Sequence, residues 1–554
     1  MTTQHGTSPV PAGGDGPRPA QPWGPADQPA RRPPPRRPRW FEVMMWALVL
    51  VWYSEAPTVL GAVVFLGGGF VLAILIQAAL DAHGERRPPA ARPADSTDLL
   101  EAVRMEAARH GGGVYLGRDE HGRWRAARAE RAVLVLGPPR SGKSSGVIIP
   151  ALLAHLGPAV STSTKPDVLA ATSPARSRVG RVWHFDPTGT ESVATGQALR
   201  WSPVTAARSW DGALLMARAM VGGARVGAGT TDQTHWSRRA SALLAPLLHA
   251  AAMSGKDVGT VVDWVLCHEL DDPGVILRRA DARIGCGVLV GLQSTEARER
   301  SSIFSAAADA LEAYTAHGAL AAASNPNFDA ERFVRSGDTI YIHAPAEDQA
   351  LAAPLVCGLL SEIRRATYQA HRDGALRGRV LFALDEAANI APLQELPQIA
   401  SEGGGQGLAL LAALQDLSQA RAHWGAQADG FLTLFGSKLI LPGVADSQTL
   451  EQISLALGEY DRQIVSTTKT RQPGMWPAPG STSRTVSTQR QRVLAPGDVA
   501  NIPAGRALYL DGLSWQLLTL TPAHRTEPWR TLTQPASLPP AQAATASRRS
   551  DASC

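Results

Sequence analysis

VLVLGPPRSGKSSGVIIPALL, residues 133–153, is the stretch that decides the fold. The apolar run at residues 132–136 predicts a buried parallel strand, and the apolar segment after Lys143 predicts a helix. Between them, Gly137 to Ser144 match the pattern G-x-x-x-x-G-K-[ST] in the strand–loop–helix context that it requires. The stretch therefore predicts a phosphate-binding loop (P-loop) in a nucleotide-binding α/β domain. An ordinary glycine-rich turn is the alternative.

Each residue type in this loop has a physical role in binding a nucleotide. The two glycines let the backbone turn its N–H groups toward phosphate oxygens, and the helix N-terminus adds partial positive charge. Lys143 supplies a full charge for the β- and γ-phosphates, and the Ser144 hydroxyl can ligate Mg²⁺. We therefore expect ATP and Mg²⁺ as cofactors. The residues expected to bind the nucleotide are Gly137, Pro138, Pro139, Arg140, Ser141, Gly142, Lys143, Ser144 and Ser145.

A second apolar run, residues 380–384, ends in the adjacent carboxylates Asp385 and Glu386. Its continuous apolar character is typical of a strand buried on both faces. We expect this strand to lie beside the P-loop strand, with Asp385 orienting Mg²⁺ and Glu386 activating the attacking water. Alone, the two acids could equally be a solvated strand end. Together with the P-loop they predict ATP hydrolysis.

A third strand is predicted at residues 408–414, after the glycine-rich segment 403–407, and it ends at Gln415. A glutamine at the tip of this strand is well placed to sense the γ-phosphate, so we include Gln415 among the catalytic candidates with Lys143 and Glu386. A polar strand cap is the alternative interpretation of Gln415.

The remaining elements predict a parallel α/β sheet with an insertion. Further strands are expected at residues 159–161, 181–185, 339–343, 438–441, 507–510 and 515–520. Long helical segments dominate residues 206–334, and strand signals resume afterwards, which indicates an all-α domain inserted into a RecA-like ATPase domain. Residues 466–492 are rich in Ser, Thr, Pro and Gly and are expected to be a mobile loop.

The N-terminal region predicts a membrane anchor. Residues 57–80 carry no charge and exceed the ~20 residues needed to cross a bilayer, whereas the apolar run at 40–53 is shorter and contains Glu42. Arginines flank the pair on both sides, so the positive-inside rule favours two spans with both ends in the cytosol. One span plus an interfacial helix is the alternative. We expect a plasma-membrane protein with most of its chain in the cytoplasm.

These features give a predicted organisation along the chain. It comprises a disordered tail rich in Pro and Arg (1–39), two transmembrane helices (40–81), a linker (82–97), the first part of the nucleotide-binding domain (98–205), the all-α domain (206–334), the second part of the nucleotide-binding domain (335–520) and a flexible C-terminal tail (521–554).

Charge and cysteine content narrow the classes of function. The chain has a formal net charge of +5, but residues 1–39 carry +4 and the residues after Thr521 carry +2, so the middle of the chain is near neutral. Any basic surface for DNA in the folded part must therefore be local. The four cysteines are scattered without metal-ligand or redox spacing, which argues against a zinc or disulfide framework and indicates a reduced compartment.

The ordered set of motifs resembles the TraG/TraD group of membrane-anchored coupling ATPases of type IV secretion, and is most similar to its actinobacterial branch. Besides the P-loop, the resemblance rests on STSTKPDVLAAT at 161–172, VWHFDPTG at 182–189, LDEAANI at 384–390 and LQDLSQARAHWG at 414–425. It covers roughly residues 40–530.

The resemblance implies a ring hexamer at the inner membrane. Such proteins collect a relaxase-bound single DNA strand and pass it to the channel components of a type IV secretion system by using ATP. Their all-α domain recognises the DNA-processing complex. By motif, the family's hydrolysis residues correspond to Lys143, Ser144, Asp385, Glu386 and Gln415.

One departure from the family concerns an arginine that acts on the neighbouring subunit's nucleotide. The family often has it just before the Gln-bearing strand, where this chain has Gly-Gly-Gly-Gln-Gly at 403–407. Arg421 and Arg462 are possible substitutes.

Other functions remain open from the sequence. A membrane-anchored ATPase that exports proteins, as type VII motors do, is the main alternative, although those usually carry several ATPase modules. An FtsK-like translocase of double-stranded DNA is a third. The absence of H-E-x-x-H in the sequence argues against a membrane protease, and the P-loop with Asp385 and Glu386 argues against a non-enzymatic scaffold.

Overall fold

The computed structural model describes residues 96–189, 196–224, 233–471, 480–512 and 514–534. The predicted tail (1–39), the predicted spans (40–81) and nearly all of the predicted linker lie outside these residues. Within the described ranges, no helix has both the length and the apolar character needed to cross a bilayer.

Most strands form one twelve-stranded sheet in the order β2-β1-β14-β13-β10-β3-β9-β8-β4-β7-β5-β6. Their bounds are β1 Tyr115–Arg118, β2 Trp124–Ala126, β3 Val133–Leu136, β4 Ala159–Ser163, β5 Val182–Phe185, β6 Gln197–Ala198, β7 Thr339–His343, β8 Val380–Leu384, β9 Leu408–Leu414, β10 Ser437–Ile440, β13 Arg506–Asp511 and β14 Ser514–Thr519.

The sheet is parallel at its centre and antiparallel along one side. All neighbours from β10 to β6 run parallel, which confirms the predicted α/β class. The strands β13, β14, β1 and β2 add antiparallel pairs. Every residue of β3, β8 and β9 is buried, because their continuous apolar runs are covered on both faces.

Helices from both ends of the chain cover the sheet. Val135 of β3 and Leu411 of β9 are buried in one cluster with Leu100 of α3 (Ser96–Arg109) and Leu152 of α4 (Ile149–Ala154). The other helices beside the sheet are α5 Asp167–Arg176, α15 Gln349–Arg372, α16 Ala387–Ile390, α17 Leu396–Glu402, α18 Leu417–Trp424, α19 Phe431–Leu434, α20 Ser447–Leu457 and α21 Pro496–Ala500.

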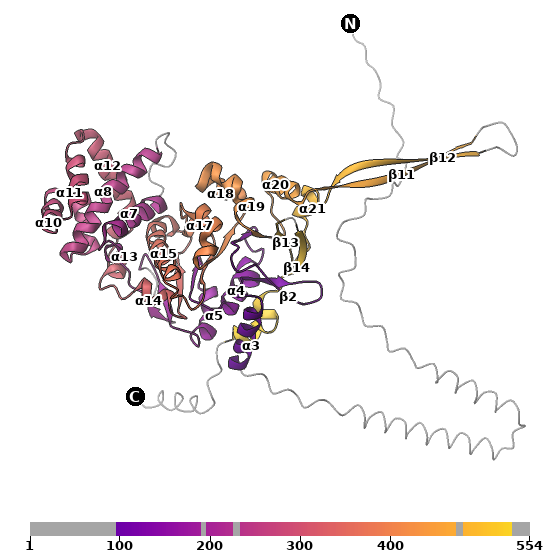
Figure 1. Cartoon of the computed structure of the whole chain (residues 1–554), viewed down its shortest axis with the longest axis horizontal. Helices are drawn as coiled ribbons and strands as arrows, with labels where there is room; N and C mark the ends of the chain where they lie inside the picture. The colour runs from indigo at the N-terminus through magenta and orange to yellow at the C-terminus, as the bar shows by residue number, and fades with distance from the viewer. Residues whose placement is uncertain (1–95, 190–195, 225–232, 472–479, 513, 535–554) are drawn as a thin grey trace, which may run out of the picture. The chain divides into compact units, whose positions relative to one another are not determined.

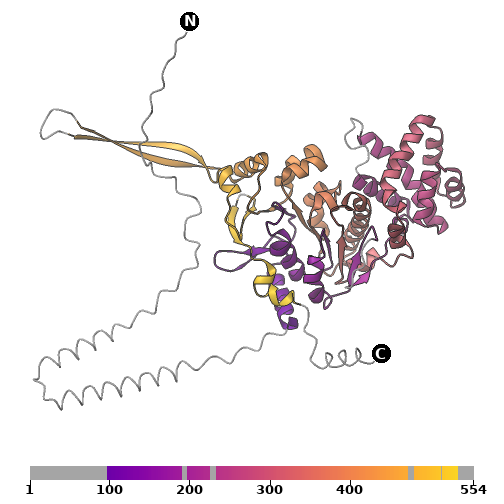
Figure 2. The same ribbon diagram turned by 180° about the vertical axis from the view of Figure 1, so that it is seen from behind.

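The chain between β6 and β7 is helical. After the short α6 (Pro203–Ala206) come α7 Trp210–Ala224, α8 Gln233–Ser254, α9 Val258–Leu266, α10 Asp271–Arg279, α11 Arg283–Gln293, α12 Ala297–Leu311, α13 His317–Ala323 and α14 Ala330–Val334 (Figures 1 and 2). Helix α7 packs against both α8 and α15, so it connects this helical region to the sheet domain.

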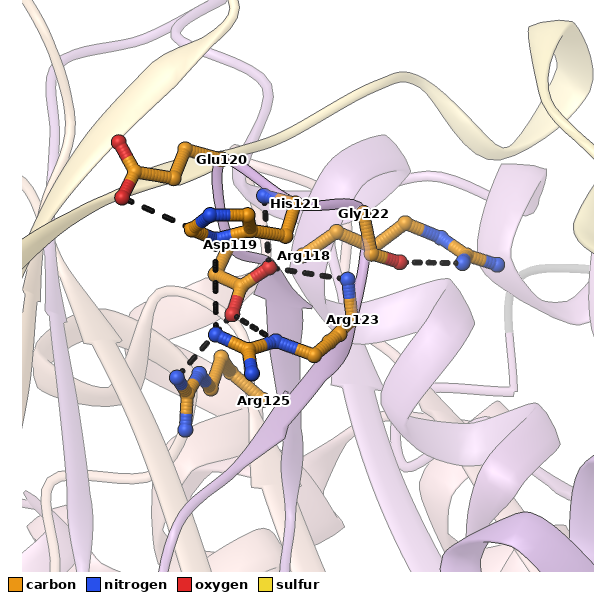
Figure 3. Close-up of polar contacts among 7 residues, drawn as sticks. All are labelled: Arg118, Asp119, Glu120, His121, Gly122, Arg123 and Arg125. Atoms are coloured by element: carbon orange, nitrogen blue, oxygen red, sulfur yellow. Dashed lines mark hydrogen bonds and ion pairs between the residues drawn. The ribbon is translucent and has the colours of Figure 1, made fainter.

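One carboxylate holds the turn between β1 and β2 (Figure 3). Asp119 Oδ1 accepts hydrogen bonds from the backbone N–H groups of His121 and Arg123, both at 2.9 Å. Its Oδ2 accepts from Arg123 Nε at 2.9 Å and Arg125 Nη2 at 3.1 Å. Burial opposes ionisation, but these hydrogen bonds and the charge of Arg123 outweigh it and lower the pKa of Asp119 to about 2. The ionised carboxylate therefore stabilises this edge hairpin.

The mobile loop predicted at 466–492 is wrong for most of its length. Strands β11 (Glu459–Arg471) and β12 (Gly480–Arg492) form a separate two-stranded antiparallel ribbon in unbroken register. Both views show it leaving the other elements beside α20 and α21 (Figures 1 and 2). The content of Ser, Thr, Pro and Gly suggested a loop. Threonine is β-branched, however, and has high β propensity, which the backbone follows here.

The flexible tail predicted from residue 521 begins too early. Trp529 and Leu532 belong to α22 (Trp529–Leu532) and are each 2% exposed. The Trp529 ring lies 5.0 Å from the ring of Tyr115 and 5.4 Å from that of Trp124. This aromatic cluster ties the C-terminal segment to the β1–β2 edge, because large rings lose much apolar surface to water when they pack together.

Candidate nucleotide-binding site

The predicted P-loop joins β3 to a helical segment that begins at Lys143. The backbone at Gly142 has φ 95°, and Arg140 has φ 65°, both in the left-handed region. At Gly137, an added Cβ would lie 2.6 Å from Ser141 Oγ and 3.0 Å from Leu441 Cβ. The loop therefore needs glycine at Gly137 for space and at Gly142 for backbone conformation.

The side chain of Lys143 is held by backbone carbonyl groups of the P-loop. Its side chain is 6% exposed, and Nζ donates hydrogen bonds to Gly137 O at 2.7 Å and Pro138 O at 3.1 Å. The same nitrogen lies 3.8 Å from Glu386 Oε1. These contacts fix the ammonium where phosphate oxygens can replace the carbonyls without a change in the position of the lysine.

Ser144 meets Asp385 directly. Ser144 Oγ donates to Asp385 Oδ2 at 2.5 Å, and Thr162 Oγ1 donates to the backbone oxygen of Asp385 at 2.9 Å. Burial raises the pKa of Asp385, while the Ser144 hydrogen bond and the charge of Lys143 oppose that shift. A hydroxyl and a carboxylate are oxygen ligands of the kind that Mg²⁺ takes, and the structure brings the two side chains together.

Glu386 has an unusual backbone and an unpaired oxygen. Its φ of 52° is left-handed, a strain on the order of 1–3 kcal/mol that persists mainly at functional sites. Its Oε2 and Ser141 Oγ are buried and have no hydrogen-bond partner in the parts of the chain that the structure describes. Two orphaned polar atoms beside a lysine, a serine and an aspartate fit a bound Mg²⁺–nucleotide and its attacking water.

The expected neighbour relation of the two key strands is wrong. β8, which carries Asp385 and Glu386, is not adjacent to β3, because β9 pairs with both of them. Leu414 of β9 is opposite Leu136, and its oxygen accepts from Gly137 N at 3.1 Å. The strand that leads to Gln415 is therefore the one beside the loop, and all three motifs meet at the carboxyl edge of the parallel strands.

Gln415 is half-buried at this edge, and its backbone N–H donates to Gln419 Oε1 at 3.0 Å. This bond and the Asp416 cap of α18 hold the strand tip. The structure thus places Gln415 at the same end of the parallel strands as the P-loop. Its role in sensing the γ-phosphate remains a prediction.

The two candidate arginines are engaged elsewhere. Arg421 Nη2 donates to Asp446 Oδ2 at 2.9 Å, and Arg462 on β11 donates from Nη1 to Gln491 Oε1 at 3.3 Å. The segment Gly403–Gln406 precedes β9, at the sheet edge opposite the P-loop. The trans-acting role of either arginine remains a prediction.

Thr162 is the residue that sequence reasoning missed. It is fully buried, and its hydroxyl fixes the backbone oxygen of Asp385. The polar run 161–167 after a predicted strand was a usable signal, because polar residues at the carboxyl end of a parallel strand face the ligand edge.

The chain is similar to known proteins in sequence and in fold. Residues 98–513 match the family model described as "Type IV secretory system Conjugative DNA transfer". A conjugal transfer protein TraG from Escherichia coli is 26% identical over 362 residues, which cover 59% of this chain and 55% of the relative. This chain thus spans about half the length of that relative.

Solved structures share the fold. The unbound bacterial conjugative coupling protein TrwBdeltaN70 superposes with a TM-score of 0.57 at 19% identity, over 76% of this chain and 90% of that one. The plasmid coupling protein TrwB in complex with ADP and Mg²⁺ gives a TM-score of 0.55 at 18% identity, over 76% and 91% of the two chains. At this identity the likeness concerns the α/β fold. The family match over most of the sequence goes further: the chain belongs to the type IV secretory system conjugative DNA transfer family.

Proposed function

We propose that the protein is the coupling ATPase of a conjugative type IV secretion system. In this role it binds ATP and Mg²⁺, and hydrolysis drives a single DNA strand from the DNA-processing complex into the secretion channel. The observation that carries the proposal is the convergence of Lys143, Ser144, Asp385 and Glu386 at one sheet edge, within a chain that belongs to the conjugative DNA transfer family.

Each residue of the site has a distinct task in hydrolysis. Lys143 exchanges its loop carbonyls for the β- and γ-phosphate oxygens and holds the terminal phosphate in place. Ser144 Oγ and Asp385 Oδ2 hold Mg²⁺, which neutralises charge that develops on the phosphates. Glu386 Oε2 has no partner among the described residues, so it can accept the proton of the attacking water. Gln415, beside the loop, contacts the γ-phosphate.

Several parts of the proposal extend beyond this site. The nucleotide assignment is supported by TrwB, whose structures include complexes with a non-hydrolysable ATP analogue and with ADP and Mg²⁺. We assign recognition of the DNA-processing complex to the helical region between β6 and β7. Anchoring in the plasma membrane through residues 40–81 follows from the apolar sequence there, and assembly as a homohexamer follows from the family resemblance.

The decisive experiment measures ATP turnover of the full chain in detergent with single-stranded DNA, with double-stranded DNA and without DNA. We expect the largest stimulation with single-stranded DNA. ATP turnover that no DNA stimulates would support the protein-export alternative, and stimulation only by the duplex would support a double-strand translocase.

A further inference from the structure

Apart from Arg462, whose trans-acting role is a prediction, the β11–β12 ribbon contributes none of the residues assigned to the nucleotide site. It contains two strands only, and its side chains are exposed from residue 459 to 469 and from 482 to 491. An isolated two-stranded ribbon is marginally stable in water and leaves both edges unpaired. Core packing therefore does not explain its sequence, and its surface chemistry is the property to examine.

The charged residues at the base of the ribbon lie close to residues of opposite charge. Arg492 donates to both carboxylate oxygens of Glu451 on α20, at 2.7 and 2.6 Å. Arg490 Nε lies 3.8 Å from Glu459 Oε2 and 3.7 Å from Asp461 Oδ1. Arg490 is thus the shared ion-pair partner of both acids of the ribbon.

Beyond the base, the ribbon is cationic without compensation. Residues 462–492 contain six Lys or Arg and no Asp or Glu, in a chain whose net charge is only +5. With Arg490 and Arg492 assigned to the base, Arg462, Lys469 and Arg484 remain as described cations, and Arg471 adds a fourth in sequence. These residues form a local basic surface, which is the kind expected for DNA binding in a chain whose middle part is near neutral.

The register places cations beside hydroxyls. Arg484 is opposite Thr467, and Lys469 is opposite Thr482. Arg484 and Lys469 are therefore diagonal neighbours on one face, with Cα atoms about 7–8 Å apart. On the other face, Arg462 is opposite Gln489 and Ile464 is opposite Ser487, and the pairs beyond them are Ser466–Thr485 and Thr468–Ser483. Arginine, lysine, serine, threonine and glutamine are the side chains that bind phosphate and sugar in nucleic acids.

We propose that the β11–β12 ribbon binds the phosphate backbone of the transported single DNA strand through Arg462, Lys469 and Arg484. The inference rests on the proposed function, which supplies DNA as the substrate. A membrane surface would also attract cations, but a segment that lies on lipid presents a continuous apolar face. Here the exposed apolar residues beyond the base, Ile464, Val465 and Val486, lie in two adjacent pairs on opposite faces and form no continuous apolar face. From Thr467 to Lys469, one face combines hydroxyls with cations and the other carries hydroxyls alone, which favours a polar, sequence-independent contact with DNA.

The test compares the full chain with its triple variant Arg462→Gln, Lys469→Gln, Arg484→Gln. Fluorescence anisotropy of a labelled single-stranded oligonucleotide is measured over a salt series, together with ATP turnover without DNA. We expect the variant to bind roughly tenfold more weakly, with the slope of log affinity against log salt reduced by about 2, since each lost contact to a single strand removes about 0.7. Turnover without DNA is also measured for the double variant Lys469→Gln, Arg484→Gln, which keeps the candidate trans-acting residue Arg462. We expect the turnover of this double variant to remain unchanged.

A matched control removes three exposed arginines from the helical region, by Arg279→Gln, Arg283→Gln and Arg298→Gln, with the same change in net charge. We expect the control to retain most of the affinity and the full salt slope. Equal losses in both triple variants would mean that overall charge, not the ribbon, drives binding, and would overturn the inference.

Two further outcomes separate the inference from the proposed function. If the wild-type chain neither binds single-stranded DNA nor responds to it in turnover, the proposed function fails. If the wild type binds and responds but the ribbon variant behaves like it, only the ribbon inference fails. Vesicles containing an anionic lipid form a third arm: loss of vesicle binding with intact DNA binding would assign the ribbon to a membrane instead.

Discussion

The nucleotide site and the β11–β12 ribbon use similar charged residues in opposite surroundings. At the site, Lys143 and Asp385 are each 6% exposed and are held by hydrogen bonds before any ligand arrives. On the ribbon, Lys469 and Arg484 are exposed and separated from acids. Buried charges interact strongly with a ligand because little water screens them. Exposed charges are screened and interact weakly, so several of them are needed to bind a ligand. The first arrangement suits chemistry on one nucleotide, and the second suits a long polyanion that must slide.

The largest effect on the nucleotide site is expected from Lys143→Ala. The change removes the buried positive charge of the P-loop, so we expect ATP turnover to fall to background, at least about a thousandfold. Turnover is measured at saturating ATP, with Lys256→Ala in the helical region as the control that should keep normal activity. Near-normal turnover of the Lys143 variant would refute the site assignment.

Glu386→Gln separates binding from chemistry at the same site. Glutamine keeps the shape of the side chain but cannot accept a proton from water, so we expect ATP to bind with near-normal affinity and hydrolysis to slow by about 10²–10⁴-fold. Nucleotide binding and single-turnover hydrolysis are measured in parallel, with Glu402→Gln as the control. If binding is lost as fully as hydrolysis, Glu386 has a structural role instead.

Salt should sharpen the contrast between the two regions. We expect binding of single-stranded DNA to weaken by an order of magnitude or more between about 50 mM and about 200 mM salt, because bound counterions are released from the strand. Nucleotide affinity should change far less, because its charges are buried. Both affinities are measured on one preparation. If salt weakened both affinities equally, the exposure of the charged side chains would not determine the salt dependence of binding.

Glu362 offers a milder test of what burial does to a charge. Burial raises its pKa to about 7, and Asp329 adds to the shift, while Trp201 and Arg365 oppose it. Because the folded-state pKa exceeds the ordinary 4.5, protonation stabilises the fold below pH 4.5, and this contribution disappears as the pH rises through about 7.

Glu362→Gln should therefore raise the free energy of unfolding above that of the wild type at about pH 8, by up to about 3 kcal/mol. The two proteins should converge at about pH 5. Urea unfolding at both pH values checks this expectation. A constant difference at all pH values would mean that the Trp201–Glu362 hydrogen bond of 2.6 Å is insensitive to charge.

The parts of the fold that the sequence predicted are those with strong local patterns. The runs that became β3, β8 and β9 are uniformly apolar and end in polar residues, so their type and their functional ends could be predicted. The insertion of β9 between β3 and β8 could not, because strand order depends on pairings between segments far apart in the chain. The site therefore contains the expected residues in an arrangement that differs from the expected one.

The misassigned segments had competing signals. Residues 459–471 and 480–492 lack apolar alternation because no core lies on either face of the ribbon, so the usual sign of a strand is absent. Their β-branched content was the remaining signal. The C-terminal helix α22 is short, and its order depends on the stacking of Trp529 with Tyr115 and Trp124, which no local pattern reveals.

The glycine-rich segment before β9 sets the distance between two strand ends. A Cβ added to Gly404 would lie 1.9 Å from the backbone oxygen of Glu130, which precedes β3, whereas one added to Gly405 would meet nothing within 4 Å. The absence of a side chain at Gly404 thus lets the backbone before β9 approach the backbone before β3 closely. β9 has seven residues, so Gln415 lies roughly 23 Å away at its far end. A single methyl group at Gly404 would therefore force the backbones of Gly404 and Glu130 apart, at the opposite end of the strand that leads to Gln415.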